Sequence, residues 1–321
     1  MVEISVIIPC YNCAKWIGRC LDALDRQTYK DFEVICIDDC STDDTVEELQ
    51  RKSAEVSFPM QIIPNKVNLG PAASRNCGIS QATGKLLAFC DSDDWYDDTY
   101  LEEMYAALSR EDADLVMCEY RKIYESNGKT VEMHYLKQYE PGGNREDLLA
   151  YSKAAMWLLL YKKELTGDLA VPDLRNGEDI AYVPCLESRA EKIAIVKKPL
   201  YNYVMRQDSA SKTPSINVYR SLLTAFDFIR TNFRGNKPDV LEYLGIKTVM
   251  YGAVLNACKA KESRKTIKGI IDTFEKRYPN WKCNKYMFLF GKNKQLFLRA
   301  VSKKRILFCQ LYAYMHQRFS V

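Results

Sequence analysis

Residues 86–94, Leu86-Leu87-Ala88-Phe89-Cys90-Asp91-Ser92-Asp93-Asp94, join an apolar run directly to three carboxylates. The run predicts a buried strand, and a strand that ends in this way carries negative charge to the carboxyl edge of a sheet, where open α/β sheets bind ligands. Carboxylates this close repel one another unless a cation or hydrogen-bond donors lie among them. Their hard oxygen atoms favour Mg²⁺ or Mn²⁺. The stretch therefore predicts a metal-dependent site, and the alternative is an acidic helix start.

The same construction recurs earlier in the chain. Residues 4–8 form a β-branched run that stops at Pro9, residues 32–37 form an apolar run that ends in Asp38 and Asp39, and residues 60–63 form a weaker third run. Between these runs the apolar residues follow helical spacing. Strands that alternate with helices predict an α/β fold with a mostly parallel, Rossmann-like sheet. The polar residues after each run should therefore lie along one crevice.

Five motifs extend this pattern: residues 6–12 (VIIPCYN), 38–43 (DDCSTD), 68–78 (NLGPAASRNCG), 91–94 (DSDD) and 176–179 (NGED). In this order and spacing they resemble the family 2 glycosyltransferases of the bacterial surface-polysaccharide type. The resemblance covers roughly residues 3–210 and implies the type-A glycosyltransferase fold, in which the sheet binds a nucleotide sugar. It departs at Cys40, where the family usually has Gly, and at Ser74, where it often has Ala. Cys40 bears on the local turn geometry more than on the chemistry.

The resemblance implies roles residue by residue. Asp93 would ligate Mn²⁺ or Mg²⁺ between the two phosphates, where a metal neutralises charge on the departing diphosphate. Local alternatives remain, because Asp39 could be a helix cap, Arg75 could form a surface ion pair and Gly70 could be an ordinary turn glycine. The residues that the resemblance assigns to the nucleotide are Pro9, Tyr11, Asn12, Asp39, Asn68, Gly70, Arg75, Asp91 and Ser92.

On the acceptor side, the resemblance makes Asp179 the general base of an inverting displacement, a role worth about 10²–10⁴-fold in rate. The alternative is that Asp179 only starts the helix that follows. Glu178 would orient the sugar or the acceptor. Trp157 could stack on a sugar ring, or it could belong to the core because it lies in an apolar segment. Arg206 is assigned to the sugar or acceptor, in a stretch that often closes over the diphosphate in the family.

The resemblance thus implies a hexosyl- or N-acetylhexosaminyltransferase that moves a sugar from a nucleotide diphosphate donor, expected to be UDP-linked, to a hydroxyl of a lipid-linked or polysaccharide acceptor. One alternative is a haloacid-dehalogenase-like phosphatase, which also has Asp-x-Asp after a strand but needs Thr or Val where Trp95 stands. Another is a catalytically silent nucleotide-sugar-binding scaffold. No Gly-x-Gly-x-x-Gly follows a strand, which argues against a nicotinamide dehydrogenase. With only His134 and His316, a Ser-His-Asp triad or a histidine-based metal centre is almost excluded.

Composition predicts a cytoplasmic protein. No apolar run approaches the ~20 residues that cross a bilayer, and the chain enters a strand at once, which predicts that no secretory signal is present. The 12 cysteines show no disulfide framework and are expected to be thiols in a reducing compartment. Cys10 and Cys13 are expected to be packing residues, because no second pair completes a zinc site.

Charge divides the chain into two parts. Residues 1–196 contain 21 Lys+Arg and 35 Asp+Glu (net −14), and residues 197–321 contain 25 and 7 (net +18), which together make the chain's +4. The basic part, in which Lys303, Lys304 and Arg305 lie among aromatic residues, suits an anionic membrane surface, so the protein could be peripheral on the inner face of the cell membrane. The alternative is a helical bundle packed on the catalytic domain.

We therefore expect a nucleotide-sugar-binding catalytic domain over residues 1–212 and a basic helical extension over residues 213–321. The expected partners are a nucleotide-diphosphate sugar, a lipid-linked or saccharide acceptor and, through the basic extension, an anionic membrane surface. No nucleic-acid-recognition motif is present, so no nucleic-acid partner is expected. The sequence indicates no oligomeric state.

Overall fold

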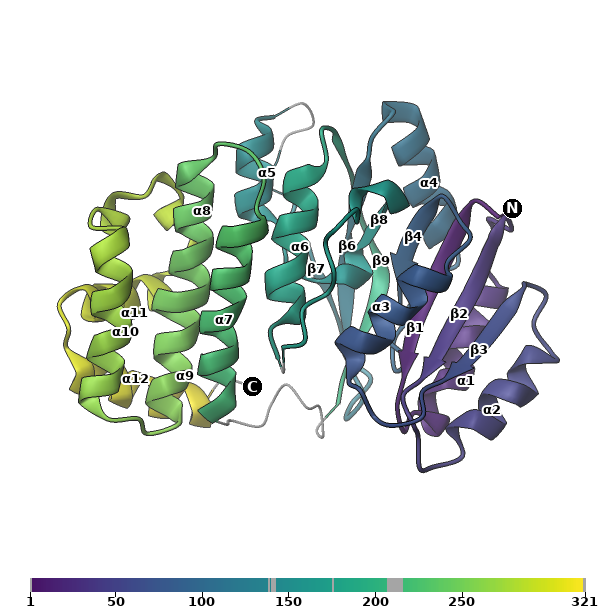
Figure 1. Cartoon of the computed structure of the whole chain (residues 1–321), viewed down its shortest axis with the longest axis horizontal. Helices are drawn as coiled ribbons and strands as arrows, with labels where there is room; N and C mark the ends of the chain where they lie inside the picture. Colours follow the sequence, from purple (N-terminus) through teal and green to yellow (C-terminus); the bar gives the residue numbers. More distant parts are fainter. Residues whose placement is uncertain (1, 138, 140–142, 175, 207–215, 320–321) are drawn as a thin grey trace. The chain divides into compact units, whose positions relative to one another are not determined.

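The computed structural model describes residues 2–319 except 138, 140–142, 175 and 207–215 (Figure 1). The chain divides into two compact units. The first unit is Met1–Gly142, Lys153–Asp173 and Leu186–Ser209, and the second is Gly143–Ser152, Leu174–Cys185 and Ala210–Val321. The predicted boundary between residues 212 and 213 lies outside the described residues, so that division stays a prediction. Two short earlier segments belong to the second unit, which the sequence analysis did not anticipate.

A sheet runs through the whole first unit, and its first four strands are parallel. These strands are β1 (Ile4–Cys10), β2 (Phe32–Asp38), β3 (Met60–Pro64) and β4 (Leu86–Phe89), in the spatial order β3-β2-β1-β4. Every residue of β2 and of β4 is buried, which is typical of parallel strands covered on both faces. The predicted α/β fold with parallel βαβ units is confirmed for this half of the sheet.

The other half of the sheet is mixed. Its strands are β5 (Trp95–Tyr96), β6 (Leu115–Tyr124), β7 (Thr130–Met133), β8 (Leu159–Lys162) and β9 (Ile193–Met205). Beyond β4 the order continues β8-β6-β9-β5, with β8 antiparallel to β4 and β6, β9 parallel to β6, and β5 antiparallel to β9. β6 and β7 pair in antiparallel fashion across a turn that contains Asn127 and Gly128.

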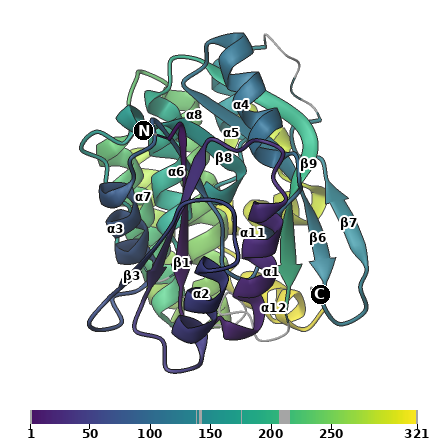
Figure 2. The same cartoon turned by 90° about the vertical axis from the view of Figure 1, so that its right-hand side faces the viewer.

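Helices cover both faces of the parallel strands. In Figure 2, α3 (Pro71–Gln81) lies on one face, and α1 (Ala14–Asp25) and α2 (Thr45–Ser53) lie on the other. Gly78 allows the close approach of α3, since a Cβ atom there would stand 2.4 Å from Cγ2 of Ile7. Two further helices are α4 (Tyr100–Glu111) and α6 (Glu178–Arg189), of which α6 begins in the second unit and ends in the first.

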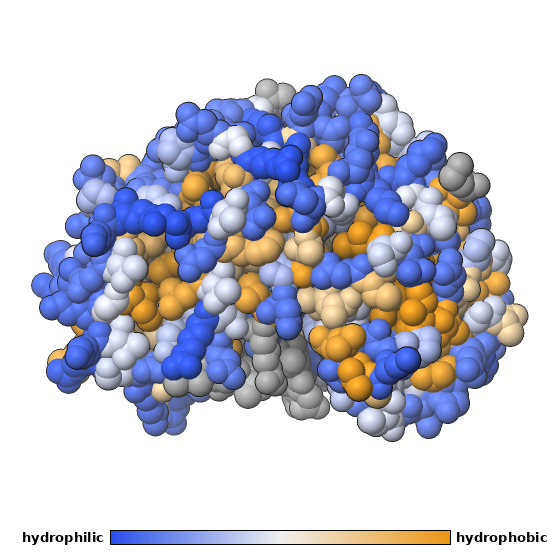
Figure 3. Space-filling model, viewed as in Figure 1, coloured by the Kyte–Doolittle hydropathy of each residue, from blue (hydrophilic) through white to orange (hydrophobic). Residues whose placement is uncertain are grey.

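Helices make up the described part of the second unit, so the predicted C-terminal helical extension is confirmed. An apolar groove of about 410 Å³ lies between α7 (Ile216–Asn232) and α10 (Arg264–Arg277) and is lined in part by Phe226 and Phe274. Figure 3 shows apolar side chains on this face, bordered by hydrophilic ones. The elements are α5 (Arg145–Tyr151), α7 (Ile216–Asn232), α8 (Pro238–Gly245), a π-helical segment (Ile246–Ala253), α9 (Val254–Lys259), α10 (Arg264–Arg277), α11 (Lys292–Ser302) and α12 (Ile306–Phe319). Among the residues described, no helix combines the length and apolar character needed to cross a membrane.

Candidate functional site

Three neighbouring strands of the first unit end at one edge of the sheet. The amide of Asp39, just after β2, donates to the carbonyl of Cys10 at the end of β1 (2.8 Å), and the amide of Cys90, just after β4, donates to the carbonyl of Ile7 (3.1 Å). The polar residues that follow these three strands therefore lie at one edge of the sheet, as predicted. Pro9 is half-buried in β1, and Tyr11, which follows the strand, is 50% exposed.

Asn12 joins the loops that follow β1 and β2. It has a left-handed backbone (φ 48°), a conformation that Asn tolerates. Its side-chain oxygen accepts from the amide of Thr42 (2.8 Å), and its own amide donates to the hydroxyl of Ser41 (3.0 Å). Cys40 is also left-handed (φ 62°), which explains why Gly is usual there in the family that the sequence resembles.

Asp39 is buried and organises the loop before α3. Its carboxylate accepts three hydrogen bonds, from the side-chain amide of Asn65 (2.8 Å) and from the backbone amides of Leu69 (2.9 Å) and Gly70 (2.8 Å). The helix-cap alternative for Asp39 does not describe this geometry, because the carboxylate holds the segment before α3 and not the start of α2. Asn68 is exposed within the same loop.

Gly70 and Arg75 connect this loop to the acidic tetrad. Gly70 precedes the first residue of α3 with φ 87°, a backbone conformation that favours glycine. One turn later, Arg75 is 5% exposed and pairs with the carboxylate of Asp91 at 2.9 Å. The pair joins α3 to the end of β4, so Arg75 is not in the surface ion pair that the sequence left open. Ser92 lies half-buried beside the thiol of Cys13.

Asp93 lies between two arginines. Its carboxylate pairs with the guanidinium of Arg206, which also stacks on the ring of Trp16 at 4.2 Å. Its carbonyl accepts from Arg19 (2.8 Å), whose guanidinium lies 4.2 Å from the ring of Trp95. Burial raises the pKa of Asp93, the charge of Asp91 raises it further, and Arg206 opposes both effects.

The carboxylate of Asp94 points away from Arg206 and into the protein. It is 1% exposed and accepts from the hydroxyl of Tyr201 (2.9 Å) and the backbone amide of Val204 (2.7 Å), both on β9. Burial raises its pKa well above the usual range, and the charges of Asp93 and Asp91 add to the effect. The three carboxylates of the tetrad thus have three different sets of partners, and Asp94 ties the tetrad to β9.

Trp157 lies in an aromatic cluster beneath β9. Its ring is 6% exposed and stacks on Tyr201 at 4.2 Å and on Tyr203 at 5.5 Å, with Tyr120 edge-on at 5.2 Å. This agrees with the core alternative that the sequence left open. Contact of Trp157 with a sugar ring stays a prediction.

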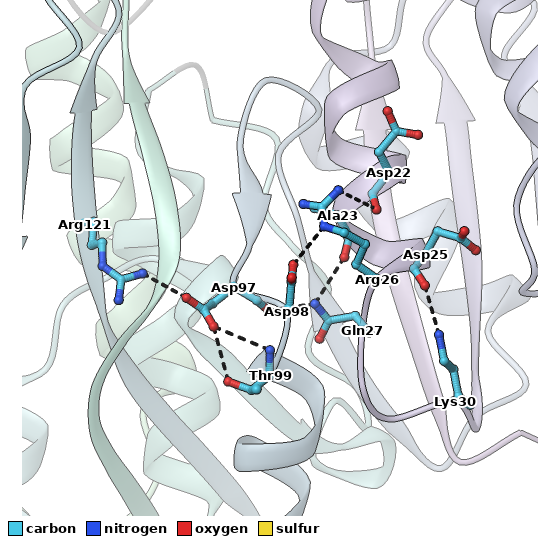
Figure 4. A network of polar contacts seen from close by, with 10 residues as sticks. All are labelled: Asp22, Ala23, Asp25, Arg26, Gln27, Lys30, Asp97, Asp98, Thr99 and Arg121. Atoms are coloured by element: carbon cyan, nitrogen blue, oxygen red, sulfur yellow. Dashed lines mark hydrogen bonds and ion pairs between the residues drawn. The ribbon is translucent and has the colours of Figure 1, made fainter.

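The loop that follows the tetrad is anchored by a separate polar network (Figure 4). Asp97 pairs with Arg121 (3.0 Å), and Asp98 pairs with Arg26 (3.1 Å). Gln27, which is fully buried, donates to the carbonyl of Asp97 at 2.7 Å. These contacts hold the loop without using Asp91 or Asp93, whose carboxylates pair with Arg75 and Arg206 instead.

The tetrad fits a divalent cation through one carboxylate. Among the residues described, no three His, Cys, Asp or Glu side chains converge into a preformed metal cage. Asp93 is the carboxylate whose partner, Arg206, is a side-chain cation about one-quarter exposed, whereas Asp91 pairs with buried Arg75. Mg²⁺ and Mn²⁺ suit a single carboxylate of this kind, because Mg²⁺ usually keeps several waters and shares its coordination with phosphates. The predicted ligand Asp93 therefore has the chemistry for such a metal.

The other predicted residues, Glu178 and Asp179, lie in the second unit and form the first turn of α6. Glu178 accepts from the backbone amide of Gly177 at 3.0 Å, and Asn176 before it is left-handed (φ 65°). Two acidic residues in a first turn interact favourably with the positive end of the helix. A helix does begin at this motif, as the alternative for Asp179 requires, while the roles of Glu178 and Asp179 in chemistry stay predictions.

Three residues of this region were not predicted from the sequence: Trp16 and Arg19, which lie beside Arg206 and Asp93, and Asn65, which donates to Asp39. Trp16 and Arg19 lie three residues apart and share one face of α1. A tryptophan beside an arginine on a surface helix is a signal that could have indicated them. Asn65 carried no such signal, because a single asparagine in a loop is common.

Residues 5–169, just over half of the chain, match Glycosyl transferase family 2. The chain is 30% identical over 221 residues to glycosyltransferase GlyA of Streptococcus pneumoniae, covering 65% of this chain and 32% of GlyA. It is 25% identical over 214 residues to the poly(ribitol-phosphate) beta-N-acetylglucosaminyltransferase TarS of Staphylococcus aureus, covering 65% of this chain and 36% of TarS. The chain thus spans about a third of the length of these two relatives.

Two solved structures share the fold. The crystal structure of S. aureus TarS 1-349 in complex with UDP-GlcNAc superposes with a TM-score of 0.75 at 19% identity, covering 98% of this chain and 92% of that one. The mannosyltransferase PcManGT from Pyrobaculum calidifontis, in complex with GDP-Man and Mn²⁺, has a TM-score of 0.59 at 17% identity, covering 99% and 88%. The likeness confirms the predicted type-A glycosyltransferase fold, and the haloacid-dehalogenase alternative is set aside. By its sequence match over residues 5–169, the chain belongs to glycosyl transferase family 2.

Proposed function

We propose that this protein is an inverting glycosyltransferase that moves a hexosyl or N-acetylhexosaminyl group from a UDP-linked donor to a hydroxyl of a lipid-linked or saccharide acceptor. The observation that carries the proposal is the position of Asp93 at the carboxyl end of β4, where its carboxylate pairs with the half-buried cation of Arg206. A nucleotide diphosphate brings two negative phosphates, and a divalent cation with arginines beside it is suited to hold them.

Different residues at the sheet edge would contact different parts of the nucleotide-sugar donor. Tyr11 offers a half-exposed ring for the base, next to Pro9. Asp39 contributes by fixing the backbone of the loop that contains Asn68 and Gly70, so that this loop is in place before a nucleotide arrives. Preformed loops of this kind lower the cost of ordering on binding. The proposal of UDP is supported by the related fold of TarS, which was crystallised with UDP-GlcNAc.

On the phosphate side, Asp91 and Arg75 form a fixed pair, Ser92 adds a hydroxyl, and Asp93 would hold Mn²⁺ or Mg²⁺. A metal bound there supplies Lewis-acid neutralisation of the charge on the departing diphosphate. A metal role is supported by the mannosyltransferase of related fold, whose complex contains Mn²⁺. Arg206 is the cation that must leave Asp93 for this to occur, and the diphosphate offers it a new anionic partner.

On the acceptor side, Asp179 would accept the proton of the attacking hydroxyl, and Glu178 would orient the sugar or the acceptor. A carboxylate in the first turn of a helix interacts favourably with the positive end of the helix, and a positioned carboxylate can take a proton as a general base. Direct attack of the acceptor from the face opposite the diphosphate inverts the anomeric centre. We further propose that the enzyme works at the cytoplasmic face of a membrane, where a lipid-linked acceptor would be presented.

Calorimetry of UDP binding with Mn²⁺ and with EDTA tests the donor site. Mn²⁺ should tighten UDP binding in the parent protein, and Asp93→Asn should remove that difference. Asp98→Asn is the matched control, because it removes one carboxylate five residues away whose partner, Arg26, is on the surface. Equal UDP affinity in Mn²⁺ and EDTA in the parent protein would contradict the metal role.

Turnover of a UDP-sugar panel with a hydroxyl acceptor tests the chemistry. Asp179→Asn should slow transfer about 10²–10⁴-fold while UDP affinity stays within a few-fold, because the amide keeps the shape but takes no proton at neutral pH. Full activity of Asp179→Asn would show that Asp179 only starts α6. Metal-dependent UDP binding without transfer to any acceptor would favour the catalytically silent scaffold.

A further inference from the structure

The last helix, α12, carries apolar residues on two opposite faces. Its inner face is buried through Ile306, Cys309 and Ala313 and packs against α9, α10 and α11. Its outer face carries five large apolar side chains that are 39–62% exposed. We call these five the outer stripe of α12: Leu307, Phe308, Leu311, Tyr314 and Met315.

The outer stripe is continuous along the helix. At 3.6 residues per turn, positions 307, 311 and 314 fall on one line and positions 308 and 315 lie beside it. Arg318 continues the line one turn later, and its guanidinium donates to the hydroxyl of Tyr314 at 2.8 Å. Single exposed apolar residues are ordinary, but a continuous row of them indicates an interaction surface.

Positive charge surrounds the outer stripe. Residues 276–321 contain eleven Lys and Arg and no Asp or Glu. Lys303 and Arg305 are exposed just before α12 begins. Lys304 between them is different, because it pairs with Asp272 (2.5 Å) and Glu275 (3.0 Å) on α10 and so belongs to the packing of this unit. The cations free to meet an external partner therefore include Lys303 and Arg305.

The apolar outer stripe and the positive charge around it together indicate which kind of partner binds this surface. A second copy of the chain would bring the same basic segment against itself, and like charges would repel. An anionic bilayer offers an apolar phase to the outer stripe and negative headgroups to the cations. Its 14 residues make α12 about 21 Å long, too short to cross a hydrocarbon core of about 30 Å, so the helix can lie only in the interface.

We infer that the outer stripe of α12 inserts into the interfacial region of an anionic lipid bilayer, with Lys303 and Arg305 on its headgroups. The inference deepens the proposed function, on which it rests for the choice of a bilayer, because a lipid-linked acceptor resides there. Binding to vesicles requires neither nucleotide nor metal. It can therefore fail while UDP binding succeeds, or succeed while transfer fails.

Co-sedimentation of the full chain with phosphatidylcholine vesicles, with and without phosphatidylglycerol, tests the inference. The parent protein should bind only the vesicles that contain phosphatidylglycerol, and added salt should weaken binding because exposed charges are screened. Leu307→Glu combined with Leu311→Glu should reduce vesicle affinity at least a hundredfold, since it removes two apolar anchors and adds two repelled charges. Lys303→Gln combined with Arg305→Gln should reduce it about 25-fold, at roughly fivefold per cation near the surface.

Phe288→Ser is the matched control, because Phe288 is 61% exposed in the same basic segment but lies outside α12. It should leave vesicle binding within a few-fold. UDP affinity and melting temperature check that each variant is folded. A parent protein that stays in the supernatant with phosphatidylglycerol at low salt overturns the inference. The inference is also overturned if Phe288→Ser reduces vesicle affinity as much as Leu307→Glu combined with Leu311→Glu. The stripe would instead be assigned to a second copy of the chain by a different result. In that case the parent protein would not bind vesicles, and sedimentation velocity would show a dimer that Leu307→Glu combined with Leu311→Glu abolishes.

Discussion

Replacing Arg206 with glutamine should make the nucleotide-free protein bind Mn²⁺ more tightly. Arg206 pairs with Asp93, the predicted metal ligand, and stacks on Trp16 at 4.2 Å. A divalent cation must therefore displace a cation that the protein already provides. Arg206→Gln removes this competing charge and leaves a shorter, uncharged polar side chain.

The geometry sets the size of the effect. Two unit charges about 4 Å apart attract by about 4 kcal/mol at an effective dielectric constant of about 20. Both side chains are 22–23% exposed, and holding them in one geometry costs side-chain entropy, so the net value should fall to about 1–2 kcal/mol. Each 1.4 kcal/mol is tenfold in affinity, so Mn²⁺ should bind about 5–30-fold more tightly. In the presence of UDP the gain in Mn²⁺ affinity should shrink, because the variant also lacks the cation that would pair with the phosphates of UDP.

Electron paramagnetic resonance of free Mn²⁺ measures this affinity without any turnover. Arg121→Gln is the matched control, because Arg121 is similarly exposed (26%) and pairs with Asp97, four residues after Asp93 (Figure 4). It removes the same charge and should leave Mn²⁺ affinity unchanged. The reasoning fails if Arg206→Gln leaves the Mn²⁺ dissociation constant unchanged or raises it, or if Arg121→Gln gives an equal gain.

Two further predictions concern the first unit. Asp39→Asn should lower the free energy of unfolding by about 2–3 kcal/mol in urea titrations and weaken UDP binding at least tenfold, because an amide cannot accept all three hydrogen bonds that hold the loop at Leu69 and Gly70; unchanged values would show that the loop orders itself. The pKa of His134 is raised by its hydrogen bond to Glu119 (2.6 Å) and its contact with Glu132, so its contribution to stability is complete below the ordinary pKa of about 6.5 and is lost as pH rises through the folded value. The melting temperature should therefore fall between pH 6 and the folded pKa more in the parent protein than in His134→Gln, and parallel curves would contradict this.

The predictions that local pattern can support were correct. Apolar runs separated by helical spacing predicted β1, β2 and β4, and the parallel pairing followed from their alternation with helices. The acidic tetrad was placed at a strand end, where the structure has it. Cys40 stands where the family usually has Gly, and its left-handed backbone agrees with the prediction that this difference concerns the local turn geometry. Each of these depends on residues close in sequence.

The mixed half of the sheet and the partners of the tetrad were not predictable in the same way. The antiparallel strand β8 pairs with β4 across about 70 residues, and Trp157 just before it is covered by tyrosines of β9. The sequence pattern around a tryptophan in an apolar segment is the same whether its ring contacts a sugar or packs in the core. Burial of such a side chain depends on which distant strand lies over it.

The sequence by itself determined the alternation of strands and helices, the family, and the division of charge between the two parts of the chain, because composition and short-range periodicity carry that information. Only the tertiary structure decided that Asp91 meets Arg75, that Asp93 meets Arg206, and that Asp94 turns inward to Tyr201. It also exposed the outer stripe of α12, since an apolar helix in a sequence does not reveal which of its faces has a partner. The physical reason is that three adjacent carboxylates are equivalent in a sequence, and they become different only when elements more than 100 residues away bring a cation to one and a buried hydroxyl to another.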